Sequence, residues 1–139
     1  MLAATAEKET PQRLRILVAE DDDEARDLLV ESLDREGYHA IELEDGFELS
    51  DYLELSNRTV SRRLQPDLIL TDVQMPGRTG LEVLREARRQ GLTCPCILLS
   101  GFAEEALRAA AQTLGPAYVL RKPFDLEALL ALVARVAGR

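Results

Sequence analysis

The sequence predicts an α/β fold, a three-layer sandwich in which helices cover both faces of a five-stranded parallel sheet. Five short apolar runs are each followed by a segment in which apolar residues recur every three or four positions, as on one face of a helix. No internal repeat or low-complexity stretch interrupts this alternation. Such alternation is typical of parallel strands joined by right-handed crossovers.

The first strand is expected at residues 14–19 and the second at residues 39–43. The first run is almost entirely apolar, whereas the second alternates as an edge strand does. Asp22 or Asp23 can cap the helix between them, and Gly37 ends it. The apolar stripe of this helix consists of Ala25, Leu28, Leu29 and Leu33.

The second helix is expected to be long. It follows the turn at Asp45-Gly46, and its helical spacing continues as far as Leu64. The residues that carry the spacing are Leu49, Leu53, Ser56, Val60 and Leu64.

A short run at residues 67–72 predicts the central strand. Its apolar residues are continuous, which is typical of a strand buried on both faces. Pro76 and Gly77 then end the strand, because proline lacks an N–H group and glycine favours a turn. Asp72 therefore stands at the carboxyl end of this strand, where open α/β sheets bind ligands.

The remaining elements alternate in the same way. Thr79 and Glu82 match a capping box at the start of a helix that Gly91 ends. The last elements are expected as a buried strand at residues 96–100, a helix at 103–114, a short strand at 118–120 and a helix capped by Asp125.

Charge and hydropathy narrow the possible functions. The net charge of −8 disfavours direct nucleic-acid binding, which needs clustered Lys and Arg. No window is apolar enough to span a bilayer, and residues 1–13, expected to form a mobile leader, lack the apolar core of a signal peptide. We therefore expect a cytoplasmic protein without membrane insertion.

Because His39 is the sole histidine, Cys94 and Cys96 do not indicate a zinc site, and Cys96 fits a small buried residue.

Polar residues end or follow four of the predicted strands, at the edge where their carboxyl ends meet. They are Glu20, Asp21, Asp72, Ser100 and Lys122. Three carboxylates repel each other unless a cation joins them, and oxygen ligands without His or Cys indicate Mg²⁺ or a similar hard ion. The hydroxyl and the ammonium add hydrogen-bond donors. The set predicts a site for a phosphoryl group, with Asp72 placed to attack it.

These motifs resemble the receiver domain of bacterial two-component response regulators, and the chain is similar to the single-domain chemotaxis regulator. The matching motifs are Glu20-Asp21, Asp72 followed by Met75-Pro76-Gly77, Ser100-Gly101, and Lys122-Pro123-Phe124. The resemblance implies one receiver domain over residues 14–139, with a flavodoxin-like (βα)5 fold and the strand order 2-1-3-4-5. It also implies a phosphorylation-dependent signalling switch rather than an enzyme.

The resemblance implies a role for each site residue. Asp72 accepts a phosphoryl group from a sensor histidine kinase or a histidine phosphotransfer protein. Mg²⁺ (or Mn²⁺) is held by Asp21, Asp72 and the backbone carbonyl of Gln74, with Glu20 acting through a water molecule. Lys122 pairs with a phosphoryl oxygen.

The resemblance also implies how the site is tuned. Ser100 bonds the phosphoryl oxygen and shifts toward it, and Gly101 leaves room beside the phosphoacceptor. Gln74 and Phe102 set how fast water reaches the phosphoryl group. The Lys122–Pro123 peptide is expected to be cis.

The sequence departs from the family at the signalling aromatic residue, three positions before the lysine. Val119 stands there, and Tyr118, one position earlier, should point to the other face of the strand. We therefore expect any output to use Ser100 and the loop after it.

The family often binds targets or dimerises through its fourth helix, fifth strand and fifth helix. A homodimer through this face and an unknown downstream protein are therefore expected partners. The last helix carries apolar residues beside its core stripe, which favours such packing. They are Ala128, Leu132 and Val136.

A second departure is the length of the second helix, which exceeds what is usual in the family. The extra residues include a small basic cluster of Asn57, Arg58, Arg62 and Arg63. A longer solvated helix and a private docking surface both remain open.

Three other functions are compatible with parts of the sequence. A Mg²⁺-dependent phosphatase with an aspartyl intermediate needs a second Asp two residues after the nucleophile. Gln74 stands at that position, which argues against a phosphatase. A flavin carrier of the same fold would place its phosphate against the acidic residues 20–23, which would repel it. A phosphorylation-independent adaptor would not need the intact site. Whether the chain stands alone or belongs to a longer protein stays open.

Overall fold

The five strands form one parallel sheet. The computed structural model describes residues 13–59, 61–101 and 105–138. The strands are β1 (Arg15–Ala19), β2 (His39–Leu43), β3 (Leu68–Asp72), β4 (Cys96–Ser100) and β5 (Ala117–Arg121). Their order in the sheet is β2-β1-β3-β4-β5, and every neighbouring pair is parallel. The predicted flavodoxin-like topology is therefore confirmed.

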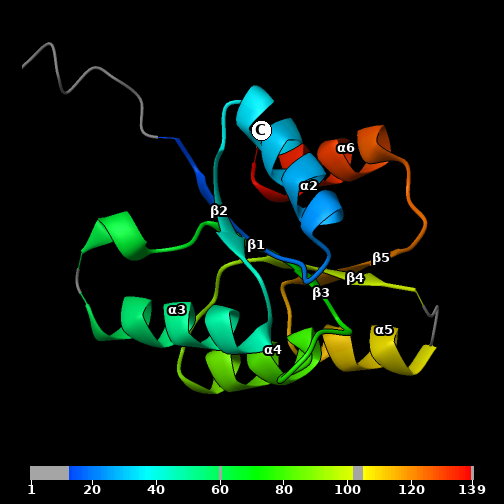
Figure 1. The fold of residues 1–139 in the computed structure, drawn as a ribbon. Coiled ribbons are helices and arrows are strands. Elements are labelled where there is room, and N and C mark those ends of the chain that lie inside the picture. Colours follow the sequence, from blue (N-terminus) through cyan, green and yellow to red (C-terminus); the bar gives the residue numbers. More distant parts are fainter. Residues whose placement is uncertain (1–12, 60, 102–104, 139) are drawn as a thin grey trace, which may run out of the picture.

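Helices cover both faces of the sheet and complete the three layers (Figure 1). One face carries α2 (Asp23–Arg35) and α6 (Leu126–Val136). The opposite face carries α3 (Gly46–Arg58), α4 (Gly80–Arg89) and α5 (Glu105–Gln112). A short 3₁₀ helix, η1 (Arg62–Leu64), lies between α3 and β3.

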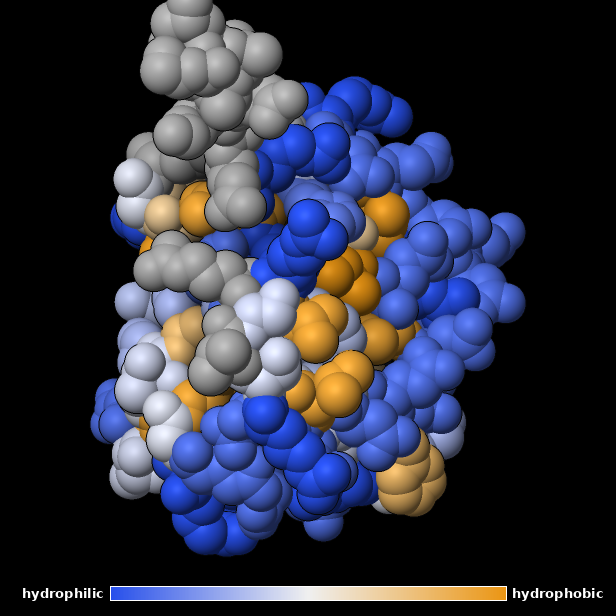
Figure 2. Space-filling model, turned by 90° about the vertical axis from the view of Figure 1, so that its left-hand side faces the viewer, coloured by the Kyte–Doolittle hydropathy of each residue, from blue (hydrophilic) through white to orange (hydrophobic). Residues whose placement is uncertain are grey.

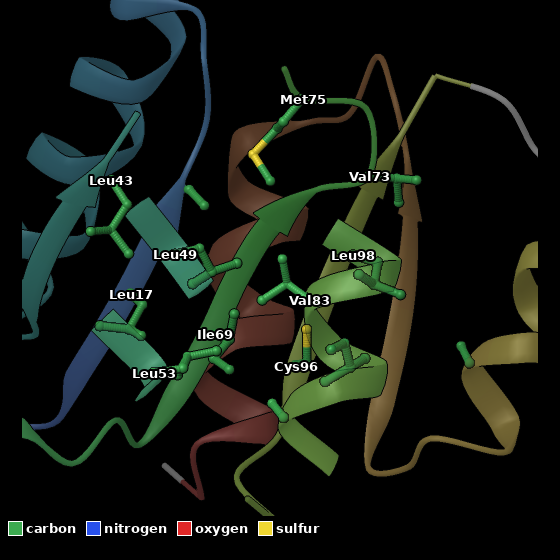
Figure 3. Close-up of a cluster of buried hydrophobic side chains, with 14 of the residues drawn as sticks. Leu17, Leu43, Leu49, Leu53, Ile69, Val73, Met75, Val83, Cys96 and Leu98 are labelled. Atoms are coloured by element: carbon green, nitrogen blue, oxygen red, sulfur yellow. The ribbon is translucent and has the colours of Figure 1, made fainter. Parts of the chain in front are cut away.

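Two hydrophobic clusters hold the layers together. Leu17, Ile69 and Leu98 point from the sheet toward α3 and α4 in the cluster that Figure 3 shows. The alternate residues of the same strands, such as Leu70 and Leu99, pack with α2 and α6. Every residue of β3 and β4 is buried, so these strands form the centre of the molecule. Each large apolar side chain buried here contributes about 1.5–3 kcal/mol of hydrophobic free energy.

The predicted caps set the helix ends. Asp22 caps α2 and accepts a hydrogen bond from the backbone N–H of Ala25. Thr79 and Glu82 form the predicted capping box of α4, and Asp125 caps α6. These side chains satisfy backbone N–H groups that have no partner within the helix.

The predicted long second helix is wrong at its end. The helix α3 stops at Arg58, where Thr59 takes an extended conformation, and Val60 lies outside the described residues. The Gln65 side chain donates to the carbonyl oxygens of Ser56 at 2.7 Å and Thr59 at 3.4 Å. These bonds satisfy carbonyl groups at the helix end, so the extra residues form a separate turn rather than a longer helix.

The surface is predominantly polar on the face that Figure 2 shows, where hydrophobic residues gather toward the middle. Within the part of the chain that the structure describes, no helix has the length and apolar content needed to cross a membrane.

Cys96 is buried as predicted, and Cys94 is half-buried. Burial raises the pKa of the Cys94 thiol to about 11 and also raises that of Cys96, so neither forms a ready thiolate.

Candidate functional site

The carboxyl ends of the central strands bring the predicted site residues to one edge of the sheet. Asp72 is the last residue of β3, and Glu20 follows β1, whose Ala19 pairs with Thr71. Lys122 follows β5, and its backbone N–H donates to the carbonyl of Ser100 at 2.7 Å. These residues come together because all five strands run in the same direction.

Three carboxylates form the acidic part of the site. Oxygens of Glu20, Asp21 and Asp72 lie within 4.8 Å of one another. Glu20 and Asp72 are buried, whereas Asp21 is exposed to solvent. An all-oxygen cluster without nitrogen or sulfur donors fits a hard divalent cation such as Mg²⁺.

Lys122 supplies the opposite charge. Its Nζ lies 2.5 Å from Oδ1 of Asp72 and 3.3 Å from Oε1 of Glu20. The Lys122–Pro123 peptide is cis, as the resemblance implied. The ammonium therefore bridges two of the three acids, and Glu20 lies 102 residues before it in the sequence.

Burial and charge perturb the acids of the site. Burial raises the pKa of Asp72 from its ordinary value of 3.8 to about 7, and the Glu20 carboxylate adds to the rise while Lys122 opposes it. Burial also acts to raise the pKa of Glu20, but bonds from the Asp22 backbone N–H, Asp72 and Lys122 bring that pKa below its ordinary value. Burial therefore outweighs the Lys122 ammonium at Asp72, whereas the hydrogen bonds and the ammonium outweigh burial at Glu20.

The other predicted site residues near Asp72 differ in how far they are exposed to solvent. Ser100, the last residue of β4, is buried and lines a surface groove of about 420 Å³ together with Gln74, which is exposed. Gly101 is exposed, and a Cβ built there would meet no described atom within 4 Å. Phe102 lies outside the described residues.

The two candidate switch residues on β5 lie on opposite faces of the strand. Val119 packs against the core cluster on the α3–α5 side. Tyr118 is 41% exposed. The alternation of side chains along a strand predicts this separation, and it leaves the Tyr118 ring outside the core cluster that Val119 contacts.

Two features of the site were not predicted from the sequence. A Cβ at Gly80 would overlap the carbonyl oxygen of Asp72, so glycine allows α4 to begin directly against the central strand. Arg26 on α2 is buried, and its guanidinium donates to the carbonyl oxygen of Glu20 at 2.8 Å. The signal for Arg26 was present, because it shares the helical spacing of the buried Leu29 and Leu33.

Known proteins share this arrangement. The model of the response regulator receiver domain family matches residues 16–134. The response regulator receiver protein CpdR of Brucella abortus is 36% identical over 116 residues, which cover 84% of this chain and 90% of CpdR. Response regulator MprA of a Mycobacterium species is 38% identical over 126 residues, 91% of this chain and 51% of MprA. The chain thus spans about half the length of MprA and of other curated relatives.

A solved structure extends the likeness to three dimensions. The response regulator TrrA of Thermotoga maritima, solved in complex with Mg²⁺-BeF, is 30% identical and superposes with a TM-score of 0.71. The match covers 88% of this chain and 98% of TrrA. The fold, the acidic site and the family match together show that the chain belongs to the response regulator receiver domain family of two-component signalling.

Proposed function

We propose that Asp72 is the phosphoacceptor of this receiver domain and takes its phosphoryl group from a phosphohistidine of a sensor histidine kinase or a histidine phosphotransfer protein. The observation that carries the proposal is the convergence of Glu20, Asp21 and Lys122 on this one buried carboxylate. A structural acid at a strand end would not need three charged neighbours from two other strands.

The reaction follows from the charges in the site. A carboxylate oxygen of Asp72 attacks phosphorus, the bond from phosphorus to the donor's imidazole nitrogen breaks, and the electron pair returns to that nitrogen. The ammonium of Lys122 lies 2.5 Å from Asp72 Oδ1 in the unphosphorylated protein. It is therefore placed to transfer its contact to the phosphoryl oxygens as negative charge arrives.

The cation site supports the same reaction. Asp21, Asp72 and the backbone carbonyl of Gln74 would hold Mg²⁺ or Mn²⁺, with Glu20 acting through a water molecule. A bound cation would neutralise charge on the phosphoryl oxygens. The solved complex of TrrA with Mg²⁺-BeF supports this assignment by similarity.

The residues around the site fit accessory roles. Ser100 would bond a phosphoryl oxygen, while Gln74, Gly101 and Phe102 would set the access of water to it. Because Val119 replaces the usual aromatic residue, we propose that output uses Ser100 and the loop after it.

The partner face is a further part of the proposal. We assign downstream binding, and a homodimer where one forms, to the surface of α5, β5 and α6. Leu132 and Val136 of α6 pack against the core cluster that α2 and α6 share, and each keeps part of its apolar surface exposed for such a contact.

Intact-mass measurement after incubation with a small acyl phosphate tests the proposal. With Mg²⁺ the wild-type protein should gain one phosphoryl group, and with a chelator it should gain none. Asp72→Asn should gain none under either condition. Equal labelling of this variant and the wild type would remove Asp72 from its role.

A further inference from the structure

Arg26 is a buried cation that the phosphoryl-transfer chemistry does not itself use. It lies on α2 with 6% of its surface exposed. Arginine is rarely buried to this extent unless its guanidinium is paired. The partners of Arg26 therefore indicate what its burial serves.

The guanidinium of Arg26 holds three oxygens. One donor bonds the carbonyl oxygen of Glu20 at 2.8 Å, and this bond is buried. The other donors reach Asp23 at 2.6 Å and Glu42 at 3.4 Å, whose side chains are 82% and 51% exposed. Ion pairs with such exposed carboxylates contribute little, so the bond to the backbone carbonyl is the distinctive contact.

The bonded carbonyl belongs to the peptide that joins Glu20 to Asp21. These residues supply two of the three carboxylates in the acidic cluster. The orientation of their shared peptide sets the directions in which both side chains leave the backbone. A planar guanidinium that holds this carbonyl therefore also holds the two carboxylates in place.

Neighbouring bonds make the same loop a fixed unit. The backbone N–H of Asp22 donates to Oε2 of Glu20 at 3.0 Å, and the backbone N–H of Glu20 donates to the carbonyl of Leu43 at 3.1 Å. Arg26 adds a link from α2 across the loop to Glu42 on β2. The acidic loop is thus tied to both a helix and the edge strand.

We infer that Arg26 is a positioning residue for the cation site, which holds the Glu20–Asp21 peptide so that the carboxylates converge before the cation binds. The inference rests on the proposed function, because it assumes that the cluster binds a divalent cation. Simple electrostatics predicts the opposite effect on cation binding. The positive charge of Arg26 repels a cation in the cluster, so if charge alone mattered, removing Arg26 would strengthen cation binding.

Metal affinity separates these two effects. Mn²⁺ binding is measured by electron paramagnetic resonance and Mg²⁺ binding by calorimetry, for wild type, Arg26→Met and Arg26→Lys. We expect Arg26→Met to bind about tenfold more weakly or worse, as when other residues that orient metal ligands are lost. Arg26→Lys keeps the charge but lacks the planar fork, so it should also bind more weakly than wild type.

Arg88→Met is the matched control. Arg88 on α4 donates to the carbonyl oxygens of Leu92, Leu114 and Pro116, away from the acidic site. This variant loses an arginine that clamps backbone carbonyls but leaves the Glu20–Asp21 peptide untouched. Its metal affinity should equal that of the wild type.

Hydrogen exchange in the metal-free protein provides a second readout. The backbone N–H of Asp22 should exchange faster in Arg26→Lys than in wild type or Arg88→Met, and this measurement also serves if Arg26→Met fails to fold. Unchanged exchange in Arg26→Lys, or unchanged or tighter metal binding in Arg26→Met, would overturn the inference. A wild-type protein that binds neither ion would instead overturn the proposed function, and the inference with it.

Discussion

Replacing Asp72 by Asn should stabilise the metal-free protein at alkaline pH. Asp72 is 4% exposed, and burial raises its pKa from 3.8 to about 7. The folded protein therefore keeps a proton on Asp72 at pH values where the unfolded chain has released it. At pH values below the pKa of Asp72 in the unfolded chain, this group causes no loss of stability. The loss grows as the pH rises toward the pKa of Asp72 in the folded protein.

The size of the effect follows from the shift. A rise from 3.8 to about 7 corresponds to at most about 4 kcal/mol in the free energy of unfolding. Asn resembles the protonated acid in shape and leaves Lys122 paired with Glu20 at 3.3 Å. Because Asn also loses the 2.5 Å ion pair with Lys122, we expect a gain of about 1–3 kcal/mol at pH 8 and little change at pH 4.

Urea denaturation in the presence of a chelator measures this difference. Wild type, Asp72→Asn and the exposed-site control Asp51→Asn are compared at pH 4 and pH 8. Added Mg²⁺ should then stabilise the wild type and have a much smaller effect on Asp72→Asn. If Asp72→Asn is no more stable than wild type at pH 8 without metal, burial does not dominate the electrostatics of this site.

Four further substitutions test other parts of the structure. Arg88→Met should lower the free energy of unfolding by about 1–3 kcal/mol in urea denaturation, because the carbonyls of Leu92 and Leu114 lose the Arg88 donor and that of Pro116 keeps the Cys96 N–H alone, and an unchanged midpoint would contradict the clamp. Gly80→Ala should destabilise the protein by about 1–3 kcal/mol and slow acyl-phosphate labelling, since its Cβ would press on the Asp72 carbonyl, and wild-type stability and rate would refute this. Tyr118→Ala should be phosphorylated and bind its partner as wild type does, whereas Ser100→Ala should lose the phosphorylation-dependent part of partner binding in a pull-down. Loss of binding in phosphorylated Tyr118→Ala alone would show that the exposed ring is the switch.

Local patterns predicted the strands and the strand edge that carries the site. The continuous apolar run before Asp72 indicated a strand buried on both faces, and every residue of β3 is buried. The convergence of Glu20, Asp72 and Lys122 followed from parallel topology alone. Separation along the chain does not matter once each residue stands at the end of a strand.

The structure differs from the prediction, or adds to it, where a contact with a backbone carbonyl decides the local arrangement. Helical spacing continued to Leu64, yet α3 ends at Arg58 because the Gln65 side chain bonds the carbonyls of Ser56 and Thr59. The helical spacing of Arg26 with Leu29 and Leu33 indicates that it is buried, but it does not reveal the bonded partner, because that partner is a backbone carbonyl. The contact of Gly80 with the Asp72 backbone is hidden in the same way.

Locating the phosphoryl group on the chain tests the central claim most directly. Borohydride reduces an aspartyl phosphate to homoserine, so tandem mass spectrometry of the phosphorylated, reduced and digested protein identifies the acceptor residue. We predict homoserine at position 72 in the sample with Mg²⁺ and at no position when a chelator is present. Homoserine at another aspartate such as Asp21, or at none in the Mg²⁺ sample, would contradict the account.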